Sequence, residues 1–210
     1  MRSLGREALL VDSTDYIVDG LKGMLTPQRF EHSRGVEGEA VRLAELYDAD
    51  VQVCKIAGLL HDCARDMSYQ DLLRTAEEHP GSAPEDCKNI PILLHSFVGA
   101  VVAKEKFGIT DERILNSIRI HTLGDVDMTL EEKVVCLADY TEPTRNFAGV
   151  TLLRTLANSD LDDALLASFD STIRHLINTR REINVRLLSA RNALLRKITD
   201  RKSSYNRKRR

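Results

Sequence analysis

The residues best suited to chemistry are histidines and aspartates that fall beside apolar residues at helical spacing. They are His32, His61, Asp62, His95, His121 and Asp139. A lone buried histidine is usually a core residue with a satisfied N–H, but a buried aspartate costs several kcal/mol unless it is paired or binds a metal. A single metal cluster would satisfy all of these residues together. Imidazole nitrogen and carboxylate oxygen suit Fe, Mn, Co or Zn rather than a structural thiolate site.

The adjacent pair His61-Asp62 is the most specific feature of this set. Neighbouring residues on a helix point about 100° apart, because one turn takes 3.6 residues. The pair can therefore bind one ion from two directions, or the carboxylate can bridge to a second ion. Two ions roughly 3.5–4 Å apart activate a water and neutralise phosphoryl oxygens during in-line displacement. The pattern thus predicts metal-assisted hydrolysis of a phosphate compound.

Almost every segment around these residues has a helical period. Apolar side chains recur at three- and four-residue steps, as at Val36, Ala40 and Leu43, and no strand pattern bounded by turn signals competes. Capping and stop signals predict helices over about residues 27–47, 50–61, 68–78, 92–107, 111–121, 129–141, a short segment after 149, 160–180 and 183–196. The sequence therefore predicts an all-α protein.

The composition is that of an ordinary soluble domain. Of the 210 residues, 42% are hydrophobic and 30% are charged. No stretch approaches the ~18 apolar residues of a membrane span, and the N-terminus makes a poor signal peptide. The four cysteines contain no C-x-x-C pair and are expected to be reduced thiols. We therefore expect a cytoplasmic protein.

The net charge of −2 hides a basic C-terminus, since residues 180–210 contain 12 basic and two acidic residues. A run of this kind can contact nucleic acid, ribosomes or another anionic surface. The more frequent role of such a segment is to remain solvated and disordered. We expect a disordered tail over 197–210 and keep nucleic-acid contact as the weaker alternative.

Several stretches resemble the HD-domain superfamily and, more closely, the YqeK family of symmetrical dinucleoside-tetraphosphate hydrolases. The matching segments are RFEHSRGV (29–36), AGLLHDCAR (57–65), HSFVGAVVAKEKFGI (95–109), IRIHTLG (118–124), EKVVCLADYTEPTR (132–145) and LLSARNALL (187–195). HTLG and ADYTEPTR are the most specific of them. The resemblance covers about residues 14–196 and implies an HD-domain helical bundle with a C-terminal helical extension.

The resemblance also implies two metal ions, iron in characterised members, and cleavage of diadenosine tetraphosphate into two ADP. By this resemblance His32, His61, Asp62 and Asp139 would hold the first ion. His95 and His121 would hold the second, with Asp62 bridging the two. The residues implied to act in catalysis are Asp62, His61, His95 and His121.

For nucleotide binding the resemblance adds Arg29, Arg65, Thr122 and Arg145, beside His32, His95, His121 and Asp139. Arginine suits phosphate because its guanidinium fork is bidentate and always charged. The expected partner is a small dinucleoside polyphosphate, and a homodimer is a further expectation. Two alternatives stay open: an HD phosphohydrolase acting on another nucleotide, such as a guanosine polyphosphate or a deoxynucleotide, and a metal- and nucleotide-binding sensor with little turnover.

Overall fold

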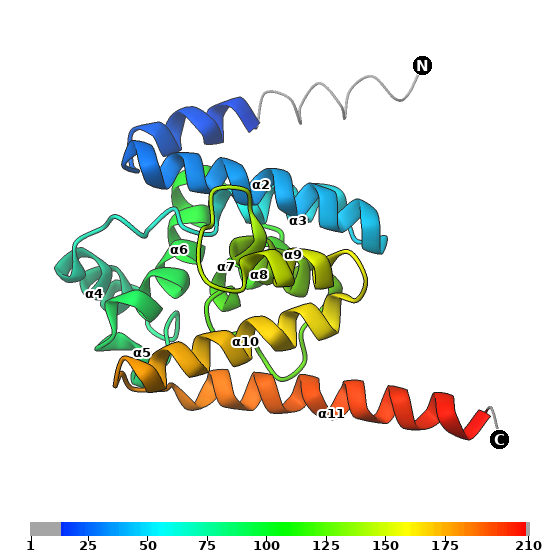
Figure 1. The fold of residues 1–210 in the computed structure, drawn as a ribbon. Coiled ribbons are helices and arrows are strands. Elements are labelled where there is room, and N and C mark those ends of the chain that lie inside the picture. Colours follow the sequence, from blue (N-terminus) through cyan, green and yellow to red (C-terminus); the bar gives the residue numbers. More distant parts are fainter. Residues whose placement is uncertain (1–13, 209–210) are drawn as a thin grey trace, which may run out of the picture.

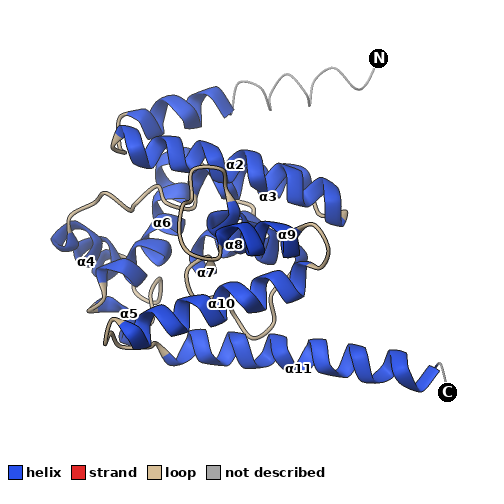
Figure 2. Ribbon diagram, viewed as in Figure 1, coloured by secondary structure: helices blue, strands red, loops and turns tan. Residues whose placement is uncertain are grey.

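The computed structural model describes residues 14–208, with side chains through residue 204, and this part of the chain is helical with no strand (Figures 1 and 2). A helix covers residues 14–22. It is followed by α2 (Pro27–Tyr47), α3 (Val51–Leu60), α4 (Tyr69–Glu78), α5 (Glu85–Lys88), α6 (Pro91–Phe107), α7 (Glu112–Ile120), α8 (Leu130–Thr141), α9 (Val150–Ala157), α10 (Leu161–Asn178) and α11 (Val185–Lys208). The prediction of an all-α protein is confirmed.

The helices begin where the capping signals predict. The Thr26 side chain accepts a hydrogen bond from the N–H of Arg29 at the start of α2. Asp50 accepts from two backbone N–H groups at the start of α3. Thr129 and Glu132 form a complete capping box at the start of α8. These side chains satisfy N–H groups that the first helical turn leaves without partners.

The structure differs from the sequence expectation in three places, the first being the helix over residues 14–22, where no helix is predicted. The four-residue helix α5 lies in a loop where no helix is predicted, because a single turn carries no periodic signal. Helix α11 runs through Lys208, although a disordered tail is expected from residue 197. Leu194 and Ile198 bury one face of α11, with 7% and 3% of their surface exposed. Beyond them Arg201 pairs with Asp160 at 2.7 Å, an anchor that depends on the tertiary fold.

Five helices surround the centre of the molecule and carry the predicted site. Helix α2 packs on α3 and α8, while α7 packs on α6, α3 and α8 (Figure 1). Gly58 permits a close approach of α3 to α2, since a Cβ there would lie 3.1 Å from the Cβ of Ala40 and 3.2 Å from the carbonyl oxygen of Val36. Among the described residues, none of the helices combines the length and the apolar character that a membrane span requires.

Candidate metal centre

The six residues singled out from the sequence meet at the centre of the helical bundle. His32 comes from α2, His95 from α6 and Asp139 from α8. His61 and Asp62 follow the last residue of α3, and His121 follows the last residue of α7. The four histidines and Asp62 are buried, and the side chain of Asp139 is 17% exposed. Five segments far apart in sequence thus deliver ionisable groups to one buried place.

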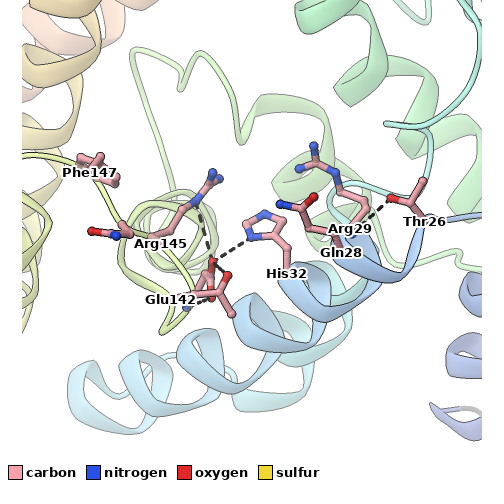
Figure 3. Close-up of a pocket in the computed structure, with 9 residues that line it drawn as sticks. Thr26, Gln28, Arg29, His32, Glu142, Arg145 and Phe147 are labelled. Carbon is pink, nitrogen blue, oxygen red and sulfur yellow. Dashed lines mark hydrogen bonds and ion pairs between the residues drawn. The ribbon is translucent and has the colours of Figure 1, made fainter.

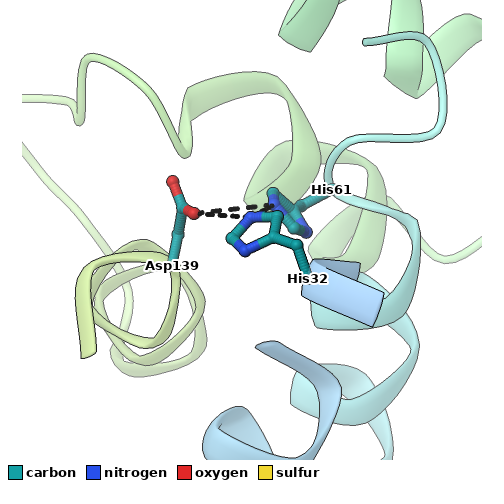
Figure 4. Close-up of side chains that lie close together, drawn as sticks. All are labelled: His32, His61 and Asp139. Atoms are coloured by element: carbon teal, nitrogen blue, oxygen red, sulfur yellow. Dashed lines mark hydrogen bonds and ion pairs between the residues drawn. The ribbon is translucent and has the colours of Figure 1, made fainter. Parts of the chain in front are cut away.

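Three of these residues form a first group, drawn in Figure 4. The Nε2 atom of His32 lies 3.0 Å from Asp139 Oδ1, and the Nε2 atom of His61 lies 3.8 Å from the same oxygen. The two Nε2 atoms are 3.2 Å apart. All three ligand atoms lie within 4.8 Å of one another, a spacing that one metal ion can span.

A second group lies on the other side of Asp62. His95 Nε2 is 2.9 Å and His121 Nε2 is 3.8 Å from Asp62 Oδ1. The other oxygen, Asp62 Oδ2, is 3.8 Å from His32 Nε2 and 3.6 Å from His61 Nε2. Each oxygen of this carboxylate therefore faces a different group of histidines. That is the arrangement a bridging ligand between two ions would have.

The second nitrogen of each imidazole is already engaged, which leaves Nε2 as the ligand atom. Nδ1 of His61, His95 and His121 lies 2.7, 2.9 and 2.7 Å from the carbonyl oxygen three residues earlier. A carbonyl only accepts hydrogen bonds, so each Nδ1 carries the proton and each Nε2 presents a lone pair. His95 Nε2 and His121 Nε2 lie 3.2 Å apart. Two lone pairs at that distance repel unless a cation lies against them, so the donor set fits a metal centre.

Burial favours the uncharged form of the histidines at this centre, but at His32 the neighbouring Asp139 and Glu142 outweigh burial and raise the pKa. At the other three histidines burial prevails. It lowers the pKa of His61 and of His95, and it lowers the pKa of His121 to about 4. Burial also works against an ionised Asp62, but the neighbouring His61 and His95 outweigh it and hold the pKa of that carboxyl well below its usual range. Neutral imidazoles and an ionised carboxylate are the forms that metal binding requires.

Arg29 and Arg145 lie at the rim of the centre, on either side of His32 (Figure 3). Arg29 Nη1 donates to Asp62 Oδ2 at 2.8 Å. Arg145 Nε donates to the backbone oxygen of Asp139 at 2.6 Å, and its Nη2 contacts Asp139 Oδ1. Both arginines line a cavity of about 450 Å³, whose walls also include Thr26, Gln28, His32, Glu142, Thr144, Asn146 and Phe147.

The remaining two residues singled out for nucleotide contacts lie beside the second group instead. Thr122 is half-buried next to His121, with its hydroxyl 3.3 Å from that of Ser96. Arg65 is half-buried, and its backbone N–H donates to the carbonyl of Asp62 at 2.9 Å. Neither residue lines the 450 Å³ cavity. A nucleotide touching all four of these residues would have to lie across the whole metal centre.

Sequence reasoning missed Glu142, a fully buried glutamate that accepts from His32 Nδ1 at 3.0 Å. In the sequence, Glu142 precedes Pro143 and indicates only the end of a helix. No spacing relates it to His32, 110 positions earlier in the chain. Phe147, the aromatic residue in the cavity wall, was also missed, because no spacing in the sequence relates it to the other residues of the cavity.

Comparison with known proteins shows the family to which the chain belongs. A model described as "HD domain" matches residues 29–144, a range that begins at Arg29 and contains all six residues of the centre. This chain belongs to the HD domain family.

Relatives of this HD domain protein have similar length and fold. It is 37% identical over 188 residues to a protein of Halalkalibacterium halodurans named "Bis(5'-nucleosyl)-tetraphosphatase, symmetrical", covering 83% of this chain and 93% of the relative. A Bacillus subtilis protein of the same name is 37% identical over 165 residues, covering 78% and 87%. The crystal structure of a "predicted HD superfamily hydrolase involved in NAD metabolism" from Clostridium acetobutylicum superposes with a TM-score of 0.84 at 39% identity, covering 88% of this chain and 97% of that one.

Proposed function

We propose that this HD domain protein is a metal-dependent hydrolase that cleaves diadenosine tetraphosphate, or a related dinucleoside polyphosphate, symmetrically into two nucleoside diphosphates. The observation that carries the proposal is the placement of Asp62, whose two carboxylate oxygens face two separate groups of histidines. The names of the two relatives that are 37% identical support the choice of substrate.

In this proposal His32, His61, Asp62 and Asp139 would hold one ion, while His95, His121 and Asp62 would hold a second. When bound, such ions lower the pKa of a water to near neutrality and neutralise charge on the phosphoryl oxygens. We propose iron as the metal, and the nitrogen and oxygen donors suit Mn, Co and Zn as well.

The arginines hold the polyphosphate against the centre. Arg29 and Arg145 each contact one ligand carboxylate, yet a guanidinium has five N–H donors, so both keep donors for phosphate oxygens. Their place on either side of His32 lets a bridging polyphosphate pass between them (Figure 3). Fixed donors at this position stabilise the negative charge that develops on the phosphoryl oxygens. The departing nucleoside diphosphate leaves as an anion and needs no general acid.

The cavity walls also offer a surface for the nucleoside. Phe147 is half-buried and lines the same cavity as Arg145. Aromatic rings stack on nucleobases with a gain of about 1–3 kcal/mol per base, largely irrespective of base identity. We propose that one nucleoside of the substrate reaches toward this ring, while Thr122 and Arg65 contact the part on the far side of the centre.

The location and the partners of the protein belong to the same proposal. We propose a cytoplasmic enzyme, in keeping with four free and buried cysteines among the described residues. A homodimer, and a contact of the basic C-terminal segment with nucleic acid or ribosomes, stay predictions of the sequence.

Metal loading combined with product analysis tests the proposed function. Purified protein should contain or take up two ions per chain by elemental analysis. After loading with Fe, Mn, Co or Zn in separate samples, at least one form should convert diadenosine tetraphosphate to ADP alone. Guanosine polyphosphates and deoxynucleotides serve as competing substrates in the same assay. Faster turnover of either would replace the proposed substrate, and binding of the tetraphosphate without turnover in every metal form would indicate a sensor.

A further inference from the structure

We infer that Glu142 is a positioning residue that fixes the orientation and the Nδ1–H form of His32, and thereby sets the affinity of one of the two metal positions. The inference rests on the metal centre of the proposed function. Glu142 is fully buried and follows the last residue of α8. Besides His32 it lies 4.0 Å from Arg145 Nε, and Arg145 contacts Asp139 of the same ligand group, so its effect would fall on the group that contains His32.

The contacts around Glu142 fit an ionised carboxylate. Oε1 accepts from His32 Nδ1–H at 3.0 Å and from the Thr144 hydroxyl at 2.6 Å. Oε2 accepts from the backbone N–H of Thr144 at 2.6 Å. Three N–H and O–H donors thus point at two oxygens, and an ionised carboxylate is the side chain that only accepts. The proton of the His32 imidazole is therefore held on Nδ1, with the Nε2 lone pair toward the centre.

The missing side chain of Gly35 on α2 makes room for this carboxylate. Gly35 lies three residues after His32, on the same face of the helix. A Cβ on Gly35 would lie 3.2 Å from Glu142 Cδ and closer still to Oε2. Any side chain at position 35 would therefore force the carboxylate to shift.

The backbone that carries Glu142 is held independently of His32. Arg154 on α9 donates to the carbonyl oxygens of Thr141 at 2.8 Å, Glu142 at 2.6 Å and Arg145 at 3.0 Å. These three hydrogen bonds hold the backbone of the loop. Because these contacts do not involve His32, Glu142 can orient that imidazole rather than follow it.

His32 differs in this respect from the other three histidines. His61, His95 and His121 donate Nδ1–H to neutral backbone carbonyls, whereas His32 donates to a carboxylate. A carboxylate partner raises the basicity of a ligand imidazole more than a carbonyl does, and losing such a partner costs about 10–100-fold in metal affinity. The metal affinity of the group that contains His32, His61 and Asp139 should therefore depend on Glu142. The metal affinity of the group that contains His95 and His121 should not.

Glutamine at position 142 distinguishes the proposed orientation of the His32 proton from a role in which the side chain only fills space. Its amide has the same shape, but its NH₂ must face either the Thr144 N–H or the His32 Nδ1–H. The backbone N–H cannot rotate, while His32 can move its proton to Nε2 and so lose its ligand lone pair. Glu142→Gln should therefore fill the same space and still misplace the His32 proton.

The test is a titration of the metal-free full-length protein with Co(II), followed by absorption and elemental analysis. Wild type should bind two ions. Glu142→Gln should weaken one of them by about 10–100-fold and leave the other unchanged. Gly35→Ala should give the same selective loss, although alanine suits a helix better than glycine. This second variant carries the test if Glu142→Gln does not fold.

The matched control is Glu39→Gln. Like Glu142, Glu39 is a buried glutamate, but it lies on α2. Glu39 accepts from Arg42 at 2.8 Å and from the Thr141 hydroxyl at 2.9 Å, away from the ligand groups. It should keep both Co(II) affinities. Two unchanged Co(II) affinities in Glu142→Gln, or an equal loss in Glu39→Gln, would overturn the inference. Because Co(II) binding needs no substrate, a protein with this selective loss but no tetraphosphate hydrolysis would refute the proposed function alone.

Discussion

Replacing Asp62 with alanine should abolish hydrolysis and release metal from both positions. Asp62 is the carboxylate with one oxygen toward His32 and His61 and the other toward His95. Its loss removes a ligand from each ion and brings the remaining imidazoles into mutual repulsion. We expect kcat/KM to fall by at least about 10³-fold, equivalent to about 4 kcal/mol of transition-state stabilisation. Elemental analysis of the purified variant should show less than one ion per chain.

Two histidines outside the centre provide the controls for this result. His79 lies at the end of α4, 3.2 Å from Glu105, and His175 is exposed on α10. Alanine at either position should preserve metal content and turnover. Retention of two ions by Asp62→Ala, or an equal loss of activity in His175→Ala, would mean that the site lies elsewhere.

Replacing Arg145 with alanine should have the second largest effect and should leave the metals in place. Its guanidinium lies at the rim of the centre and lines the cavity beside Phe147. Removing one fixed donor to a developing negative charge costs about 10²–10³-fold in kcat. Lysine should restore only part of this loss, because an ammonium cannot reproduce the bidentate fork.

The control for this variant is Arg74→Ala, since Arg74 is an exposed arginine paired with Asp71 on α4. It should behave as wild type. If Arg145→Ala loses one metal ion together with its activity, then Arg145 acts by holding Asp139 and not by contacting phosphate. If kcat/KM stays unchanged, the polyphosphate does not pass over this part of the rim.

The candidate ligands could be predicted from the sequence because each one interrupts a local pattern. His32, His95 and Asp139 fall on helical faces that are otherwise apolar, where an ionisable group needs a special reason. His61 and His121 end such faces. Periodicity and capping rules likewise predict most helices, because caps and apolar spacing are local properties of the chain.

The parts that could not be predicted depend on contacts between distant segments. Glu142 lies 110 residues from His32, and the gap at Gly35 has meaning only once α2 lies against the end of α8. Helix α11 continues past residue 197 because Arg201 meets Asp160, the N-cap residue of α10, and Lys202 meets Asp163 on α10. None of these pairings produces a regular spacing of residues in the sequence. Local rules therefore identify the candidate ligands but not the residues that contact them from distant segments.

Hydrolysis of diadenosine tetraphosphate in water enriched in heavy oxygen tests the central claim most directly. If water attacks one of the two inner phosphorus atoms, a new P–O bond forms there, and the bond from that phosphorus to the central bridging oxygen breaks. The bridging oxygen leaves with the second ADP. We predict ADP as the sole nucleotide product, with half of the molecules carrying a single heavy oxygen on the terminal phosphate. Formation of ATP and AMP in equal amounts would contradict it, because the polyphosphate would then be cut away from its centre.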